Sequence, residues 1–102
     1  SNTILCPLRV FPTRTQPVFI AGTNDAFWRL FCKALGKQDW LDDERFKTNA
    51  GRVEHRAVLE PMIEAHFREH TADELLARLI PAGMPCSAAY KVSDAMASEH
   101  AR

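Results

Sequence analysis

The sequence shows no surplus of charge of either sign, because 13 lysine and arginine residues balance 13 aspartate and glutamate residues. Proteins that bind nucleic acid or an anionic membrane through long-range electrostatic attraction carry a net positive charge, which this chain lacks. It also contains no apolar stretch near the roughly 20 residues that a helix needs to cross a bilayer. We therefore expect neither a nucleic-acid nor a membrane partner, and a cytoplasmic location.

Cysteine is scarce, and the 3 cysteines are widely spaced with no C-x-x-C pair. A disulfide framework would need an even number of cysteines, and a zinc knuckle would need close pairs of ligands. The number and the spacing argue against both. We expect Cys6, Cys32 and Cys86 to be buried or half-buried free thiols.

Apolar material is sufficient for one core, since 46% of the 102 residues are hydrophobic. This content argues against wholesale disorder and suits one domain, which we assign to residues 1–102. A domain of this size is small for an enzyme with a deep cleft of its own.

Three short β-prone segments predict a sheet. Residues 5–11 and 17–21 are apolar and are separated by the polar stretch 12–16, which is typical of two strands joined by a turn. Residues 86–90 are interpreted as a third strand. Prolines at positions 7 and 17 indicate strand ends or a sheet edge.

The clearest helix follows the second predicted strand. Asn24 can cap it, and Gly36 stands where a left-handed C-cap is expected. Between these two residues, apolar side chains recur with the helical period of one buried face. They are Phe27, Leu30, Phe31, Ala34 and Leu35.

The middle of the chain is expected to be helical in pieces. One or two turns capped by Asp39 and Asp43 would place Trp40 and Phe46 inward. A longer helix is predicted from about Asn49 to Glu69, with a kink or break at Pro61, which lacks a backbone donor. One face of its second half is apolar and holds Leu59, Met62, Ile63, His66 and Phe67.

The sequence Thr71-Ala72-Asp73-Glu74 is a capping box, and the helix after it should place Leu75, Leu76, Leu79 and Ile80 inward. The turn 81–85 ends that helix, and Ser93 can cap a last short helix through Met96. The order of segments predicts an α+β fold, in which a small three-stranded antiparallel sheet packs with four to five helices.

This order resembles the small domain of the family III CoA-transferases of the CaiB/BaiF type, a group that includes formyl-CoA transferase, carnitine CoA-transferase and α-methylacyl-CoA racemase. No single motif is specific, but four in order at matching separations cover the chain from about Pro12 to Ala101. They are Gly22-Thr23-Asn24 followed by Trp28, Leu35-Gly36 followed by 40–46, Asn49 with Arg52, and Gly83-Met84-Pro85-Cys86.

Some positions depart from the family pattern. Thr15-Gln16 replaces a usual Asp-Gly turn, and Glu44 stands at a proline position, which removes a pre-organised helix start. Leu75 replaces a common tryptophan, and 87–89 lacks the usual proline and valine. These departures weaken any inference about substrate while leaving the fold assignment unchanged.

The resemblance implies a division of labour between two domains. In the family, a large Rossmann-like domain holds CoA and supplies an aspartate that forms acyl-anhydride and thioester intermediates. That aspartate and a glycine-rich loop precede the matched segment. We therefore expect the large domain to be absent from residues 1–102, assign no catalytic residue, leave the CoA-binding residues unknown, and expect no transfer by the chain alone.

Two functions stay open. The first is a fragment of an acyl-CoA-handling enzyme, a CoA-transferase acting between carboxylic acids or a related racemase. The fragment would form the wall of the active-site cleft and part of an interlocked homodimer. Acyl-CoA and carboxylic acid would be its substrates through the large domain, and it would bind no cofactor itself. The alternative is a stand-alone, non-catalytic protein-interaction module; in both cases exposed apolar patches should favour oligomerisation.

The sequence His66-Phe67-Arg68-Glu69-His70 matches the H-x-x-E-H of inverted zinc peptidases, in which two histidines share a metal and glutamate acts as base. Since Thr71 begins a new capping box, His70 falls in the last turn of a helix, where the helix dipole favours a cation. The chain also offers no persuasive third ligand after it. We therefore expect cap or surface histidines and no metal.

Other polar and aromatic residues also have structural interpretations. Asp42, Asp43 and Glu44 suit a helix N-terminus better than a metal or acid–base cluster. Arg45 and Arg52 could reach a phosphate, but structural ion pairs are expected. The aromatic side chains that could stack on a ligand are expected to pack instead. These are Trp28, Trp40 and Tyr90.

Overall fold

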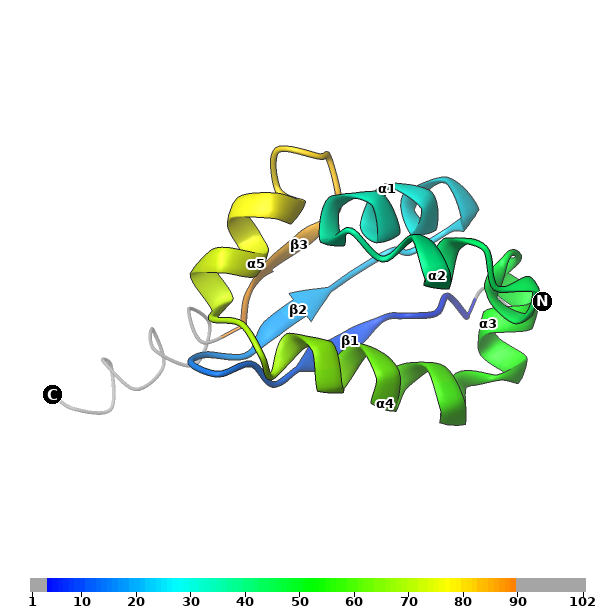
Figure 1. The fold of residues 1–102 in the computed structure, drawn as a ribbon, viewed down its shortest axis with the longest axis horizontal. Coiled ribbons are helices and arrows are strands. Elements are labelled where there is room, and N and C mark those ends of the chain that lie inside the picture. The colour runs from blue at the N-terminus through cyan, green and yellow to red at the C-terminus, as the bar shows by residue number, and fades with distance from the viewer. Residues whose placement is uncertain (1–3, 90–102) are drawn as a thin grey trace, which may run out of the picture.

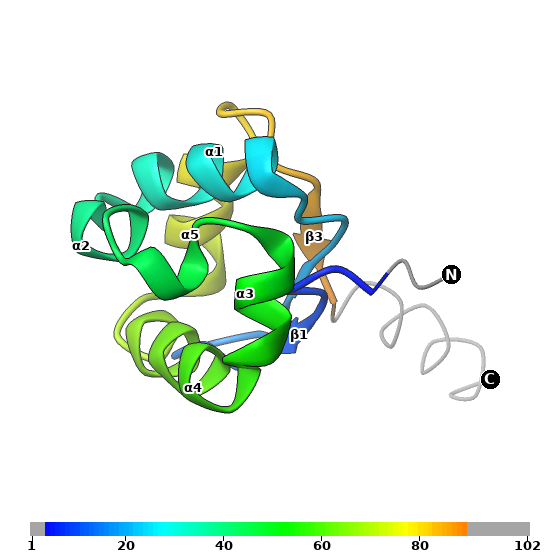
Figure 2. The ribbon, with the colours of Figure 1, turned by 90° about the vertical axis from the view of Figure 1, so that its right-hand side faces the viewer.

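The computed structural model describes residues 4–89 and shows a three-stranded antiparallel sheet with helices packed on one of its faces (Figures 1 and 2). The α+β fold expected from the sequence is confirmed. In chain order the elements are β1 (Arg9–Phe11), β2 (Val18–Ile20), α1 (Asp25–Leu35), α2 (Gln38–Leu41), the 3-10 helix η1 (Glu44–Phe46), α3 (Asn49–Glu54), α4 (Arg56–Phe67), α5 (Ala72–Leu79) and β3 (Cys86–Ala88).

The sheet has the order β1-β2-β3, so the strand nearest the end of the described chain pairs with β2. Val10 lies opposite Phe19, and Phe19 lies opposite Ser87. Successive side chains alternate between faces, so this row lies on the face away from the core. Each strand is 3 residues long, shorter than the predicted segments, and Tyr90 lies outside the described residues.

Helix α1 follows its sequence signals closely. The side chain of Asn24 accepts a hydrogen bond from the backbone N–H of Phe27 at 2.8 Å, and Gly36 ends the helix at φ 70°. The buried face differs slightly from the predicted one: Trp28, Phe31, Cys32 and Leu35 are buried. Because both tryptophans then lie inside, Trp28 stacks with Trp40 at a centroid distance of 6.4 Å.

The next segment forms two short turns, as expected, with Trp40 and Phe46 buried. Asp43 caps η1 by accepting from the backbone N–H of Arg45. The predicted cap at Asp39 is wrong, because α2 begins at Gln38, two residues earlier than that cap implies, and Lys37 occupies the N-cap position without a side-chain hydrogen bond.

The long central helix is divided, but the break is at His55 and not at the predicted Pro61. His55 ends α3 with φ −104° and ψ 26°, outside the helical region, and its Nδ1 lies 3.0 Å from the carbonyl oxygen of Gly51. Pro61 lies inside α4, where it removes only its own backbone donor. Helix α4 nevertheless continues through Pro61 to Phe67.

Helix α5 begins with the predicted capping box of Thr71 and Glu74. Leu75 and Leu79 are buried as expected, whereas Ile80 is 56% exposed, so its predicted inward position is wrong. The reason is that α5 ends at Leu79 and the chain turns outward through 80–83. The short helix predicted from Ser93 to Met96 lies outside the described residues.

The core lies between the helices and the inner face of the sheet. Trp28 of α1, Phe46 of η1 and Phe67 of α4 come from three different elements and are fully buried. Phe67 also contacts Phe11 of β1 with a centroid distance of 5.5 Å. Within residues 4–89 no helix has both the length and the hydropathy needed to cross a membrane.

Candidate functional site

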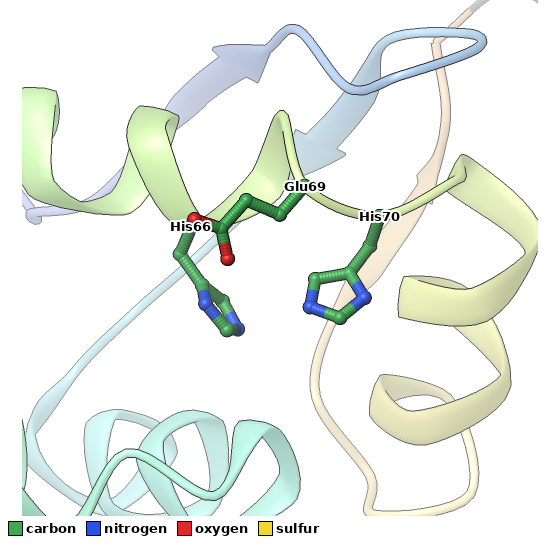
Figure 3. A group of neighbouring side chains, drawn as sticks. All are labelled: His66, Glu69 and His70. Atoms are coloured by element: carbon green, nitrogen blue, oxygen red, sulfur yellow. The ribbon is translucent and has the colours of Figure 1, made fainter.

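Three possible metal-ligating side chains meet where α4 ends. Beyond Phe67 the backbone makes one more tight turn, in which the N–H of Glu69 donates to the carbonyl of His66 at 3.1 Å. This turn carries His66, Glu69 and His70 to the same side of the chain (Figure 3). One possible ligand atom from each residue lies within 4.8 Å of the other two, and no other such group occurs among the described residues.

His66 is held by packing and not by hydrogen bonds. Its ring contacts Trp40 edge-on at a centroid distance of 5.7 Å and lies 4.9 Å from the ring of His70. Its Nε2 is buried and has no hydrogen-bond partner. Burial, followed by the nearby His70 and Lys37, lowers the pKa of His66 from its ordinary value. The neutral ring therefore has a buried nitrogen without a partner.

His70 has a carboxylate partner from the next helix. Its Nδ1 lies 3.5 Å from Oε1 of Glu74, which also accepts the backbone N–H of Thr71 at 2.8 Å in the capping box. The hydrogen bond from the Thr71 backbone is the main cause that lowers the pKa of Glu74. The contact between His70 and Glu74 was not anticipated from the sequence, although their spacing of four residues would allow it.

A shallow cavity of about 310 Å³ opens beside His66 and Glu69. Trp40 and Met62 give it apolar walls, and the ammonium of Lys37 lies 5.1 Å above the Trp40 ring. A second cavity of about 370 Å³ has a basic rim. It is lined by Trp28, Arg29, Lys33, Leu41, Asp42 and Lys47.

Arg52 has the structural role expected of it. It is fully buried, its Nε donates to the carbonyl of Cys6 at 2.7 Å, and its Nη2 donates to Oδ1 of Asp25 at 2.9 Å. Arg45 pairs with Asp43 at 2.7 Å on the surface, so it also forms an ion pair. Neither guanidinium is therefore left to bind a phosphate.

The acidic run 42–44 is divided among local contacts. Asp43 caps η1, Asp42 accepts from the side chain of Gln38 at 3.1 Å, and Glu44 lies 3.6 Å from Lys47. These separate partners agree with the helix-terminus interpretation, because the three carboxylates do not meet at one point as a metal or acid–base cluster would require.

The three cysteines are free thiols, as expected. Burial raises the pKa of Cys6 to about 11 and that of Cys32 to about 12, so both are protonated near neutrality. Cys86 is half-buried, and burial raises its pKa as well. These thiols lack the depressed pKa of a nucleophilic cysteine.

The family model described as "CoA-transferase family III" matches residues 1–102. Among curated proteins, a succinyl-CoA–D-citramalate CoA-transferase of Chloroflexus aurantiacus is 29% identical over 97 residues, which cover 94% of this chain and 24% of that protein. A succinate–glutarate CoA-transferase of Agrobacterium fabrum is 31% identical over 83 residues, 78% of this chain and 21% of that protein.

Solved structures agree with these matches. The crystal structure of a CAIB/BAIF family protein from Brucella suis superposes with a TM-score of 0.80 and 31% identity, over 91% of this chain and 25% of that chain. The structure of Rv3272 from Mycobacterium tuberculosis gives a TM-score of 0.76 at 25% identity, over 83% of this chain and 24% of that one. The chain thus spans about a quarter of the length of these relatives.

Proposed function

Because this chain belongs to CoA-transferase family III, we propose that it forms one part of an enzyme that transfers CoA between carboxylic acids. The observation that carries the proposal is the family match over the whole sequence, together with relatives that are named CoA-transferases. The substrates of that enzyme would be an acyl-CoA thioester and a free carboxylic acid. Names of the relatives favour a dicarboxylic acid such as succinate, glutarate or citramalate.

Within that enzyme, residues 1–102 form a small domain that walls the active-site cleft. The described residues support this division: Arg45 and Arg52 each pair with a carboxylate of the same chain, and burial raises the pKa of the cysteine thiols, so neither group suits acyl transfer. A carboxylate nucleophile from a large domain would carry the covalent step, which splits one difficult exchange into easier ones. The chain itself would hold no cofactor and act in the cytoplasm.

The proposal includes a homodimer, with apolar surface as its support. Ile4 and Leu8, at the start of the described chain, are 50% and 45% exposed, and Val10 on the outer face of β1 is 44% exposed. Three exposed apolar side chains within a short stretch of sequence support a surface that another part of the assembly covers.

A graft tests the role of the chain in the enzyme. The matched segment of the Agrobacterium fabrum enzyme is replaced by this chain, and CoA transfer from succinyl-CoA to glutarate is measured for the graft and for the chain alone. A second graft with a Gly/Ser linker in the same place is the control, and CoA binding confirms that the large domain is folded. We expect transfer by the first graft only. Turnover by the isolated chain, or a folded, CoA-binding graft without transfer, would overturn the proposal and favour the interaction module.

A further inference from the structure

We propose that His66, Glu69 and His70 form a binding site for one divalent transition-metal ion, with Zn²⁺ as the best match (Figure 3). The expectation of no metal, made from the sequence, stays a prediction that the structure does not test, and the geometry points the other way. The inference does not depend on the proposed transferase function, because it uses only contacts within this chain.

The first support is the donor set. Two imidazoles and one carboxylate are the ligands of many three-ligand zinc sites, which keep a fourth position open. Ligand atoms around one Zn²⁺ lie about 3.4 Å apart when each bond is about 2.1 Å long. The observed separations of up to 4.8 Å are wider than this. Small rotations of the exposed Glu69 side chain and the half-buried His70 side chain toward the fixed ring of His66 would close the gap.

The second support is independent of the spacing. Nε2 of His66 is buried without a hydrogen-bond partner. A buried polar atom without a hydrogen-bond partner destabilises the fold, and such atoms are uncommon in native proteins. A metal ion on the lone pair of this nitrogen would remove that cost, and the packing of the ring against Trp40 already fixes its orientation.

The third support comes from the partner of His70. Glu74 holds Nδ1 of this ring at 3.5 Å, which leaves Nε2 available as a ligand. Metal-binding histidines usually donate their other ring nitrogen to a carboxylate or carbonyl, and this contact sets the tautomer. Glu74 is itself fixed by its hydrogen bond from Thr71, so α5 supplies a rigid support for a ligand at the end of α4.

The surroundings set limits on the affinity and the type of metal. Glu69 and Glu74 attract a cation, whereas Lys37 beside Trp40 and Arg78 of α5 oppose it. We therefore expect modest affinity. Nitrogen donors with one carboxylate favour Zn²⁺, Ni²⁺ and Cu²⁺ over Mg²⁺ and Ca²⁺, which prefer oxygen ligands. The cavity of about 310 Å³ beside His66 and Glu69 leaves room for water in the fourth position.

In this arrangement Glu69 is a ligand. The H-x-x-E-H of a peptidase would use the same residue as a general base and would take its third ligand from elsewhere in the chain. Here the three donors come from five consecutive residues, and α5 holds one of them in place. The site therefore resembles a surface chelate that links the end of α4 to the start of α5, and we assign it no hydrolytic activity.

The test is a titration of the full chain with Zn²⁺ after the chain has been treated with a chelator. Calorimetry measures the affinity and the stoichiometry, and NMR measures the imidazole ¹⁵N shifts of all 4 histidines. We expect one ion per chain, with shifts at His66 and His70 and none at His55. His70→Ala and Glu69→Gln should each weaken binding at least about tenfold. His55→Ala and His100→Ala are the matched controls and should bind like the unmodified chain.

The variant Glu74→Gln tests whether Glu74 only orients His70 or binds the metal ion itself. It should weaken Zn²⁺ binding by less than His70→Ala and leave the stoichiometry unchanged, because Glu74 acts through His70. Titration with Mg²⁺ should give no shift at either ring. Absence of saturable binding by the unmodified chain would overturn the proposal. Shifts at His55 or His100 in place of His66 and His70, or unchanged affinity in His70→Ala, would do the same and place any ion elsewhere.

Discussion

The guanidinium of Arg52 donates to the carboxylate of Asp25 at 2.9 Å, and this bond ties α3 to the start of α1 across the core. Arg52 is fully buried, and it also donates to the carbonyl oxygens of Cys6 at 2.7 Å and Phe46 at 2.9 Å. Burial lowers its pKa, and Asp25 opposes that shift. A single side chain thus satisfies backbone carbonyl groups of two separate segments, the chain before β1 and η1.

We predict that Arg52→Met lowers the free energy of unfolding by about 2–4 kcal/mol, because it leaves buried carbonyl groups unsatisfied. Arg52→Lys should lose nearly as much, since one ammonium cannot replace three donors spread over a planar fork. Urea unfolding of both variants measures the effect. The exposed Arg29→Met is the control and should stay within about 0.5 kcal/mol of the unmodified chain. Equal stability of Arg52→Lys and the unmodified chain would contradict the proposed role.

Gly51 provides a second stability prediction. A methyl group there would collide with the carbonyl oxygen of Arg45, which belongs to the backbone of η1 and cannot easily move away. We expect Gly51→Ala to cost about 2–3 kcal/mol despite the better helix propensity of alanine. The neighbouring Ala50→Gly should cost only about 1 kcal/mol. Thermal unfolding that ranked the two variants in the opposite order would refute the steric explanation.

Most of the signals that the sequence carries locally are confirmed, and the cap predicted at Asp39 is the exception. The caps at Asn24, Gly36 and Thr71 depend on chemistry within about four residues of each site, so the sequence alone defines them. The break was predicted at Pro61 because proline is the strongest local signal for a helix break, but the structure has it at His55, where no comparable signal stands in the sequence. Ile80 was expected inside because its position continues the spacing of the buried apolar residues of α5, but α5 ends at Leu79.

The candidate metal site was only partly visible in the sequence. The spacing of His66, Glu69 and His70 is evident, but the sequence does not show that Nε2 of His66 is buried without a partner. That property depends on Trp40, which comes from a distant part of the chain. The support from Glu74 depends on the turn between α4 and α5. Long-range packing therefore decides whether this motif is a cap or a chelate.

The thiols give a prediction about reactivity. Cys6 and Cys32 are protonated far above neutrality, so each should react with a disulfide reagent about a hundredfold more slowly in the folded chain than in the unfolded chain at about pH 8. Cys86 should react first, since it is only half-buried. Mass spectrometry after timed labelling measures the order, and early modification of Cys6 would contradict it.

The same shifts predict how stability changes in alkali. Burial raises each folded-state thiol pKa above the ordinary value of 9.0, so the thiols stabilise the fold below pH 9.0. That contribution falls as the pH rises through 9.0 toward about 11 for Cys6 and about 12 for Cys32. Denaturant unfolding measured across this range should show the loss. Cys6→Ala should reduce the fall in the free energy of unfolding with pH over this range. An unchanged fall in that variant would rule out Cys6 as its source.

The capping box predicts a difference between neutral and acid stability. Thr71→Ala should cost about 1 kcal/mol, because the backbone N–H of Glu74 loses its acceptor. The hydrogen bond from the Thr71 backbone lowers the pKa of Glu74 below its ordinary value of 4.5, so the contribution of Glu74 to stability is present above pH 4.5 and is lost as the pH falls through the folded-state pKa. Glu74→Gln should remove this part of the acid dependence, as followed by unfolding between neutral pH and acid.

The outer face of the sheet provides the last prediction, which concerns assembly. Val10 is 44% exposed and lies opposite Phe19 on the face of the sheet that no helix among residues 4–89 covers (Figure 2). The chain spans about a quarter of the length of its relatives, so the isolated chain lacks the remainder of the enzyme that could cover this face. We expect the isolated chain to self-associate and Val10→Lys to raise the monomer fraction without lowering stability, since the new side chain points to solvent.

Ile80→Lys is the matched control, because Ile80 is 56% exposed but lies at the end of α5, away from this face. Sedimentation velocity over a range of concentrations distinguishes the two variants. If the unmodified chain is a clean monomer, or if Ile80→Lys dissociates it as well as Val10→Lys does, the contact does not form through β1.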